Sequence, residues 1–207
     1  MPKNRADEVD LDQEQALLDG LLVDLDRCFE QVVLRYEQRL FAFALRLSGS
    51  YEEAQEITQD AFVRAYHALS GYAVEQVRTL ALRAWLYQIV LNVARNRLRK
   101  LRRLPACLSL EQASADLDEE PESAPANGPE AHLEARERQR LLQQALLMLP
   151  LPYREVIVLR HIEGLSYPEL ARLLNQPIGT VKARVHRGLT QLRQVLANHH
   201  AREVLYD

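Results

Sequence analysis

Basic side chains near the C-terminus have the types and the spacing of a helix that reads double-stranded DNA. A guanidinium or ammonium group binds phosphate, and an arginine can also pair with the edge of a guanine through two hydrogen bonds. No Asp or Glu occurs between residues 170 and 202, so this stretch favours a polyanionic partner. The candidate DNA-contacting residues are Thr180, Lys182, Ala183, Arg184, His186 and Arg187.

The elements that must position these side chains are a short helix, a tight turn and a second helix. Ser166 followed by Glu169 has the spacing of a capping box, which predicts that the first helix begins there. Asn175 tolerates left-handed backbone and is expected to end it, and Pro177 with Gly179 indicates the turn. The core face of the second helix is predicted from apolar residues at helical spacing: Val181, Val185, Leu189 and Leu192. The pattern predicts a helix-turn-helix.

A second basic surface lies in the first half of the chain, where every charge between residues 76 and 110 is positive. A helix is expected from about Leu82 to Arg103. Its packed side is predicted to carry Trp85, Ile89, Val93 and Leu101. Another side is predicted to carry a polar stripe of Gln88, Asn92, Arg95, Arg99 and Arg102. Two basic surfaces in a chain of formal net charge −3 indicate two points of contact with one polyanion.

Composition predicts an all-α fold of two small helical domains, joined by a flexible acidic linker. Leu and Ala dominate, Gly is scarce, and no long alternating pattern suggests strands. Residues 104–132 are rich in Ala, Ser, Pro and acids and are assigned to the linker. The predicted division is an acidic N-terminal segment 1–24, a helical domain 25–103, this linker, a helix-turn-helix domain 133–200 and a tail 201–207.

Several classes of function are not indicated by the sequence. Cys28 and Cys107 are isolated from other metal-binding residues, so no metal site is expected. No nucleophile constellation or phosphate-binding loop suggests an enzyme or a cofactor. No apolar stretch is long enough to cross a membrane, and the N-terminus does not resemble a signal peptide, so a cytoplasmic location is expected.

Three segments together resemble a bacterial RNA polymerase sigma factor of the extracytoplasmic function (ECF) group. They are AQEITQDAFVRAY (54–66), AWLYQIVLNVARNRLRK (84–100) and LPLPYREVIVLRHIEGLSYPELARLLNQPIGTVKARVHRGLTQLR (149–193). The resemblance covers nearly everything except the acidic N-terminus and the linker. It implies two helical domains that bind core RNA polymerase and promoter DNA, and it leaves open whether an anti-sigma factor binds the chain.

The resemblance also implies roles for particular residues. The helix-turn-helix would read the −35 promoter element as duplex. Recognition and opening of the −10 element would fall to Tyr72, Arg83, Asn92, Arg95, Asn96, Arg99 and Lys100. The polymerase would be contacted by Gln55, Glu56, Gln59, Asp60, Phe62 and Arg64. Between Tyr72 and Trp85 the chain is a few residues longer than is usual in the family, so the contacts of this loop are not assigned individually.

Two alternatives remain open from the residues themselves. One is a transcriptional activator whose helix-turn-helix is fused to a helical sensing domain, although such a protein has no need of the second basic surface. The other is a helical interaction protein that does not bind DNA, which would lack a salt-sensitive affinity for DNA. A further hypothesis is that the acidic N-terminus covers a basic surface in the free protein.

Overall fold

Local capping residues divide the first half of the chain into helices. In the computed structural model, which describes residues 5–101 and 129–203, α1 spans Arg5–Val23, α2 spans Leu25–Ser48 and α3 spans Tyr51–Ser70. Asp24 accepts from the backbone N–H of Arg27, at 3.0 Å, to start α2. Gly49 ends α2 in the left-handed conformation, with φ +77°, which glycine adopts without steric cost. Ser50 then caps α3.

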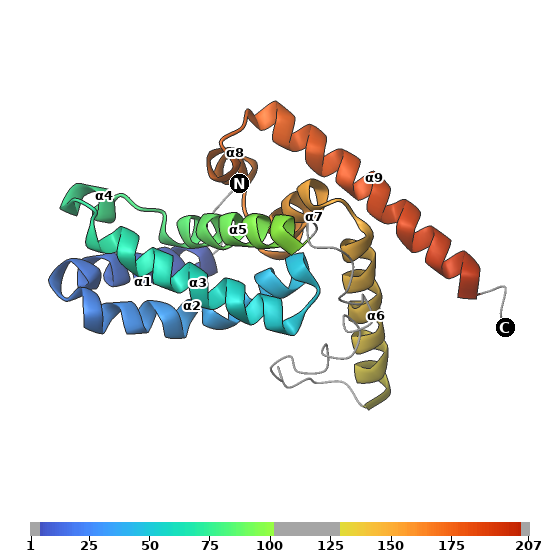
Figure 1. Ribbon diagram of the computed structural model, residues 1–207, viewed down its shortest axis with the longest axis horizontal. Helices are drawn as coiled ribbons and strands as arrows, with labels where there is room; N and C mark the ends of the chain where they lie inside the picture. The colour runs from blue at the N-terminus through green and yellow to red at the C-terminus, as the bar shows by residue number, and fades with distance from the viewer. Residues whose placement is uncertain (1–4, 102–128, 204–207) are drawn as a thin grey trace.

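The N-terminal domain is a bundle in which α2, α3 and α5 lie side by side (Figure 1). The short helix α4 spans Val74–Arg78 and α5 spans Leu82–Leu101. The core of α5 differs from the prediction: Trp85 and Ile89 are half-buried, and Leu101 is 38% exposed. Val93 is buried as predicted, and the rest of the side that the bundle buries is formed by Leu82, Leu86, Tyr87, Val90, Leu91 and Ala94.

The acidic N-terminal segment forms a helix that the sequence analysis did not predict. Helix α1 packs on α2 and α4, and its Leu18 and Leu21 are buried. The Glu14 carboxylate accepts from the backbone N–H of Arg83 at 3.0 Å, next to the start of α5. This segment therefore satisfies an N–H that the first turn of a helix leaves without an intrahelical partner.

The C-terminal domain comprises α6 (Pro129–Met148), α7 (Leu151–Ile157), a π-helical turn (Val158–Ile162), α8 (Tyr167–Leu174) and α9 (Ile178–Glu203). The sequence from Tyr153 to Glu163 favours one helix that Gly164 ends, but only its first half is α-helical. Helix α6 begins three residues before the predicted end of the linker. The rest of the linker, with Cys107, lies outside the described residues.

The helix-turn-helix forms as the capping residues predicted. The Ser166 hydroxyl accepts from the N–H of Glu169, and the Glu169 carboxylate accepts from the N–H of Ser166 at 2.7 Å. Burial alone would raise the pKa of Glu169, but the hydrogen bonds from Ser166 and the nearby positive charges outweigh it and lower that pKa. Asn175 ends α8 with φ 50°.

The two domains pack against each other, with α8 beside α5 and α6 against the end of α2 (Figure 1). The Gln143 amide donates to the Leu45 carbonyl at 3.1 Å. A Cβ placed on Gly49 would lie 2.7 Å from the Leu147 side chain of α6. Gly49 therefore serves both the turn and the domain contact. In the described part of the chain, no helix is long and apolar enough to span a membrane.

Gly49→Ala is expected to destabilise the protein by about 2 kcal/mol, because an alanine costs roughly 1–2 kcal/mol in left-handed backbone and here also displaces Leu147. Chemical denaturation of the full chain measures the loss. Gly71→Ala is the matched control, since Gly71 has φ −102° and no atom closer than 3.7 Å to its built Cβ. Equal stabilities of the two variants would contradict the role given to Gly49.

Candidate nucleic-acid and polymerase interfaces

Helix α9 presents the predicted DNA-contacting residues on one side and its core residues on the other. Val181 and Val185 are buried, whereas Lys182, His186 and Arg187 are exposed. Thr180 and Ala183 are exposed as well. The helical spacing of the apolar residues sets this division, so the turn and the core together aim the basic side chains outward.

Two of the basic side chains on this helix are held in place. The Lys182 ammonium lies 5.6 Å from the centre of the Tyr167 ring, and Arg160 lies over the same ring at 4.9 Å. Arg184 is half-buried, and its Nη1 lies 3.4 Å from a carboxylate oxygen of Glu155 on α7. Arg184 therefore differs from Arg187, which extends from the same face without such a pairing among the described residues.

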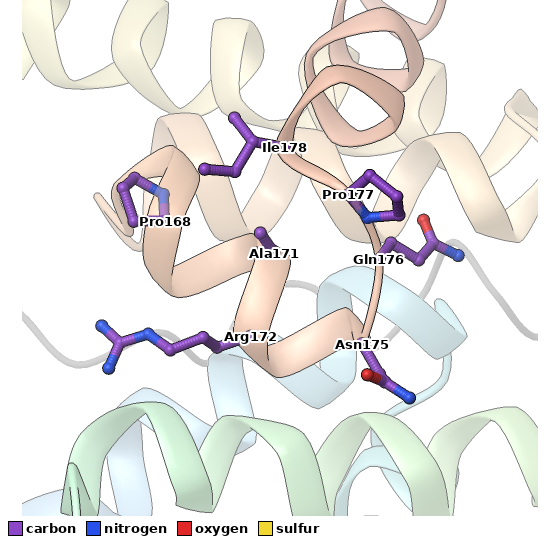
Figure 2. Close-up of a pocket in the computed structure, with 7 residues that line it drawn as sticks. All are labelled: Pro168, Ala171, Arg172, Asn175, Gln176, Pro177 and Ile178. Carbon is purple, nitrogen blue, oxygen red and sulfur yellow. The ribbon is translucent and has the colours of Figure 1, made fainter.

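Two shallow hollows flank α9. One lies over the turn, where Pro168 and Ile178 face each other with Ala171 between them (Figure 2). The other runs along the predicted reading face, between α9 and the start of α7. Its lining comprises Pro152, Tyr153, Thr180, Ala183, Arg184 and Arg187.

The predicted −10 residues divide into an exposed set and an occupied set. Asn92, Asn96, Arg99 and Lys100 are exposed on α5. Arg83 and Arg95 are half-buried against the C-terminal domain. Tyr72 and Trp85 form a ring pair in which the indole N–H donates to the Tyr72 hydroxyl at 3.3 Å.

A single buried carboxylate joins the two predicted DNA surfaces. Glu155 has a side chain only 2% exposed, and Arg95 Nη2 lies 2.5 Å from the same oxygen that contacts Arg184 at 3.4 Å. Arg95 Nε also donates to the second oxygen at 2.9 Å, which makes that pair bidentate. One arginine from each predicted DNA surface is therefore paired with the same carboxylate at this point.

Glu163, directly after the π-helical turn, forms a second bridge between the domains. Its carboxylate accepts from the Tyr87 hydroxyl and lies 3.7 Å from Arg46, while its carbonyl accepts from Arg83 at 3.1 Å. Burial and the Glu163 charge raise the pKa of Tyr87 well above its ordinary value, so the hydroxyl remains protonated and donates.

Sequence reasoning missed Arg154, Glu155, Glu163 and Tyr87. The only signal was an ionic pair, Arg154-Glu155, directly before the apolar run Val156–Leu159. Charged residues at the edge of a core-forming segment are rarely buried unless they have partners. Their partners lie far away in sequence, and local periodicity does not identify them.

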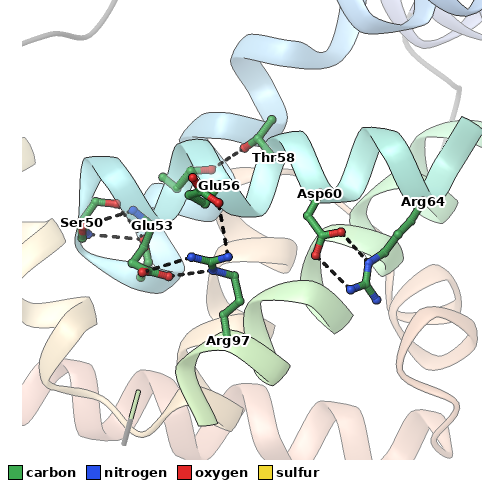
Figure 3. A network of polar contacts seen from close by, with 9 residues as sticks. Ser50, Glu53, Glu56, Thr58, Asp60, Arg64 and Arg97 are labelled. Atoms are coloured by element: carbon green, nitrogen blue, oxygen red, sulfur yellow. Dashed lines mark hydrogen bonds and ion pairs between the residues drawn. The ribbon is translucent and has the colours of Figure 1, made fainter. Parts of the chain in front are cut away.

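The predicted polymerase surface follows one side of α3 (Figure 3). Gln55, Glu56 and Gln59 are exposed. The Asp60 carboxylate accepts two hydrogen bonds of 2.9 Å from Arg64, and this interaction raises the pKa of Arg64. Phe62 is a correction: it is 9% exposed and packs edge-on against Phe29, so it supports this surface from the core.

Arg97 connects this surface to α5. Its Nε donates to Glu53 at 2.9 Å, and its Nη1 donates to Glu56 at 3.5 Å (Figure 3). The hydrogen bond with Glu53 is the main cause that raises the pKa of Arg97. Arg97 is therefore bound to α3, although it belongs to the basic stretch 76–110 that was predicted to contact DNA.

Glu155→Gln is expected to lower the free energy of unfolding by about 2 kcal/mol, because it leaves two half-buried guanidinium groups without their charged partner. Glu30→Gln on the exposed side of α2 is the control and should change stability by less than about 0.5 kcal/mol. Denaturation with urea measures both. Equal losses would mean that Glu155 contributes no more than a surface charge.

Comparison with known proteins identifies both domains. Residues 32–104 match the model of Sigma-70 region 2, and residues 139–192 match the model of Sigma-70, region 4. The ECF RNA polymerase sigma factor SigW of Bacillus subtilis is 35% identical over 170 residues, which cover 81% of this chain and 88% of SigW. The RNA polymerase sigma-H factor of Pseudomonas aeruginosa is 29% identical, with 89% and 94% covered.

Solved structures agree with this relationship. CnrH in complex with the cytosolic domain of CnrY has 26% identity and a TM-score of 0.60, with 89% of this chain and 97% of that chain covered. The sigma factor RpoE of Bartonella quintana, in complex with the anti-sigma factor NepR, has 28% identity and a TM-score of 0.59, with 82% and 96% covered. The chain is similar to sigma factors in both domains, in their order and along most of its length. This similarity excludes the two alternatives that the residues left open, a transcriptional activator with a sensing domain and an interaction protein that does not bind DNA. The chain therefore belongs to the extracytoplasmic function group of RNA polymerase sigma factors, which direct core RNA polymerase to promoters.

Proposed function

We propose that this sigma factor reads the −35 element with α9, reads and opens the −10 element with α5, and docks on core polymerase with α3. The observation that carries the proposal is the exposed basic face of α9, held outward by a buried apolar stripe. In this role the chain needs no catalytic group of its own, because the polymerase performs the chemistry. A cytoplasmic location follows from these partners and is part of the proposal.

On α9 the proposal assigns base reading to Arg187 and phosphate contacts to Lys182 and Arg184. Arg187 is exposed at the centre of the face and can form two hydrogen bonds with a guanine. Ala183 is small and lets the helix approach the bases closely. His186 lies on the same face and is included among the contacts.

On α5 the proposal assigns the exposed amides to bases and the exposed cations to the backbone. Asn92 and Asn96 are one turn apart and can pair with the edge of an unstacked base. Arg99 and Lys100 suit phosphates. Tyr72 and Trp85 are paired with each other and half-buried, so a base that stacks here meets the part of either ring that this pair leaves exposed.

The arrangement of the two domains must change when both elements are bound. Arg95 and Arg184 contact the same oxygen of Glu155 and are therefore side by side. The two promoter elements are about 25 base pairs apart, which is about 85 Å along B-DNA. We infer that the domains separate when the protein engages a promoter, and that this releases Arg83 and Arg95 for the −10 region.

Similar solved structures point to a further protein partner. The structures of CnrH and RpoE similar to this chain are complexes, one with the cytosolic domain of CnrY and one with the anti-sigma factor NepR. We extend this to the present chain and propose that an anti-sigma factor binds it.

The function is tested by transcription in vitro with core RNA polymerase and a promoter library. The full chain should produce promoter-dependent start sites that core polymerase alone does not produce. Start sites that do not change when the chain is added would overturn the proposal.

Asp60→Arg is expected to reduce binding of the chain to core polymerase at least tenfold, because it replaces an acceptor of Arg64 with a repelling charge in the middle of the docking surface. Affinity for duplex DNA should stay the same. His67→Arg, at the exposed C-terminal end of the same helix, is the control. Unimpaired holoenzyme formation by Asp60→Arg would argue against docking through this part of α3.

Arg187→Ala is expected to cost about 1–3 kcal/mol of promoter binding and to relax the preference at one position of the −35 element. Arg193→Ala removes an exposed charge further along α9 and should weaken binding equally for all sequences. Selection of bound sequences by each holoenzyme measures the difference. An unchanged preference in Arg187→Ala would exclude base reading by this residue.

A further inference from the structure

We propose that the hollow between α7 and α9 is a specificity site that accepts the C5-methyl group of a thymine in the −35 element, with the Tyr153 ring as one wall. This inference rests on the proposed function of α9 and extends it to a residue of α7. Tyr153 belongs to no predicted DNA-contacting set, and no basic charge indicates it.

The hollow lies on the predicted reading face of α9. Thr180, Ala183, Arg184 and Arg187 fall within an arc of about 100° on α9, at about 100° per residue, and therefore share one face of the helix. The opposite wall consists of Pro152 and Tyr153, at the start of α7. The hollow has a volume of about 480 Å³, so it admits the edge of a base.

Helices α7 and α9 approach each other closely at Gly188, which has no side chain. A Cβ at this position would lie 2.9 Å from the Ile157 side chain and 3.3 Å from the Tyr153 Cβ. A larger residue would have to displace the end of the Ile157 side chain and would crowd the Tyr153 Cβ. Glycine here therefore keeps the Tyr153 ring beside the reading face.

Arg184 and Arg187 form the basic rim of the hollow. Arg184 is held by Glu155, which is itself buried and paired with Arg95. A side chain fixed in this way loses little freedom on binding. Arg187 lies on the same face of α9 and supplies a second positive charge, so a DNA strand is attracted to this edge of the hollow.

The residues that line the rest of the hollow are largely apolar. The Ala183 methyl, the Thr180 methyl, the Tyr153 ring and Pro152 form an apolar patch within a basic face. In the major groove the thymine methyl is the apolar group that bases present, and alanine and threonine methyls are typical contacts for it. The apolar patch thus matches a thymine, with Arg187 placed to contact a neighbouring base or phosphate.

The test uses holoenzyme formed from core polymerase and the full chain, on a promoter that this holoenzyme selects from a random library. Each thymine of the upstream element is replaced singly by deoxyuridine, which lacks only the C5-methyl. Burial of one methyl is worth about 0.8 kcal/mol, so one replacement should weaken promoter binding about fourfold. Tyr153→Phe should retain this penalty, because the Tyr153 hydroxyl makes no hydrogen bond among the described residues.

Tyr153→Ala should remove the penalty, so that the thymine and deoxyuridine promoters bind alike. Thr180→Ser changes only one methyl on an exposed residue and should reduce the penalty to about twofold, which tests the site without risk to the fold. The proposal is overturned if no replacement weakens binding, or if Tyr153→Ala keeps the full penalty. It is also overturned if a methylphosphonate scan shows that Tyr153→Ala loses a phosphate contact instead. Failure to select any promoter would instead count against the proposed function.

Discussion

Two adjacent buried ions in α7, Arg154 and Glu155, connect the helices of both domains and fix their positions relative to one another. The Arg154 guanidinium donates to the carbonyls of Leu146, Leu147 and Leu149 and also to the Leu47 carbonyl of the other domain. It thereby satisfies carbonyls that the C-terminal ends of two helices leave open. Glu155, the next residue, binds an arginine from each predicted DNA surface. Burial of these charges is tolerated only because each of them has partners.

This polar contact explains how the domains can be closely packed and still separate. A buried ion pair adds little net stability compared with an apolar contact, because removal of both charges from water offsets their attraction. Once the domains part, Arg95 regains water or reaches a DNA phosphate. Glu155 remains paired with Arg184, because α7 and α9 belong to the same domain and pack directly against each other. The same carboxylate therefore supports the reading helix in both arrangements.

Sequence reasoning succeeded where the determining contact is local. The Ser166–Glu169 cap, the left-handed Asn175 and the apolar stripe of α9 all depend on residues within one or two turns. It failed where the determining contact is distant. Leu101 was expected in the core, but it is the last residue of α5 and is 38% exposed. Arg95 was expected to contact DNA, yet in this structure it is paired with Glu155, 60 residues further along the chain.

The contacts of α5 narrow its DNA surface to less than the basic run suggested. At about 100° per residue, Asn92, Asn96 and Arg99 fall within an arc of about 60°. Arg97 points well away from this arc and is bound to Glu53 and Glu56 of the polymerase surface. Arg95 borders the arc and is bound to Glu155 in the closed arrangement. Charge alone made these arginines equivalent, but Arg97 is paired with α3 and Arg95 with α7, whereas Arg99 is exposed on the arc. Promoter DNA therefore meets the amide-rich arc first, and Arg95 joins it only after the domains separate.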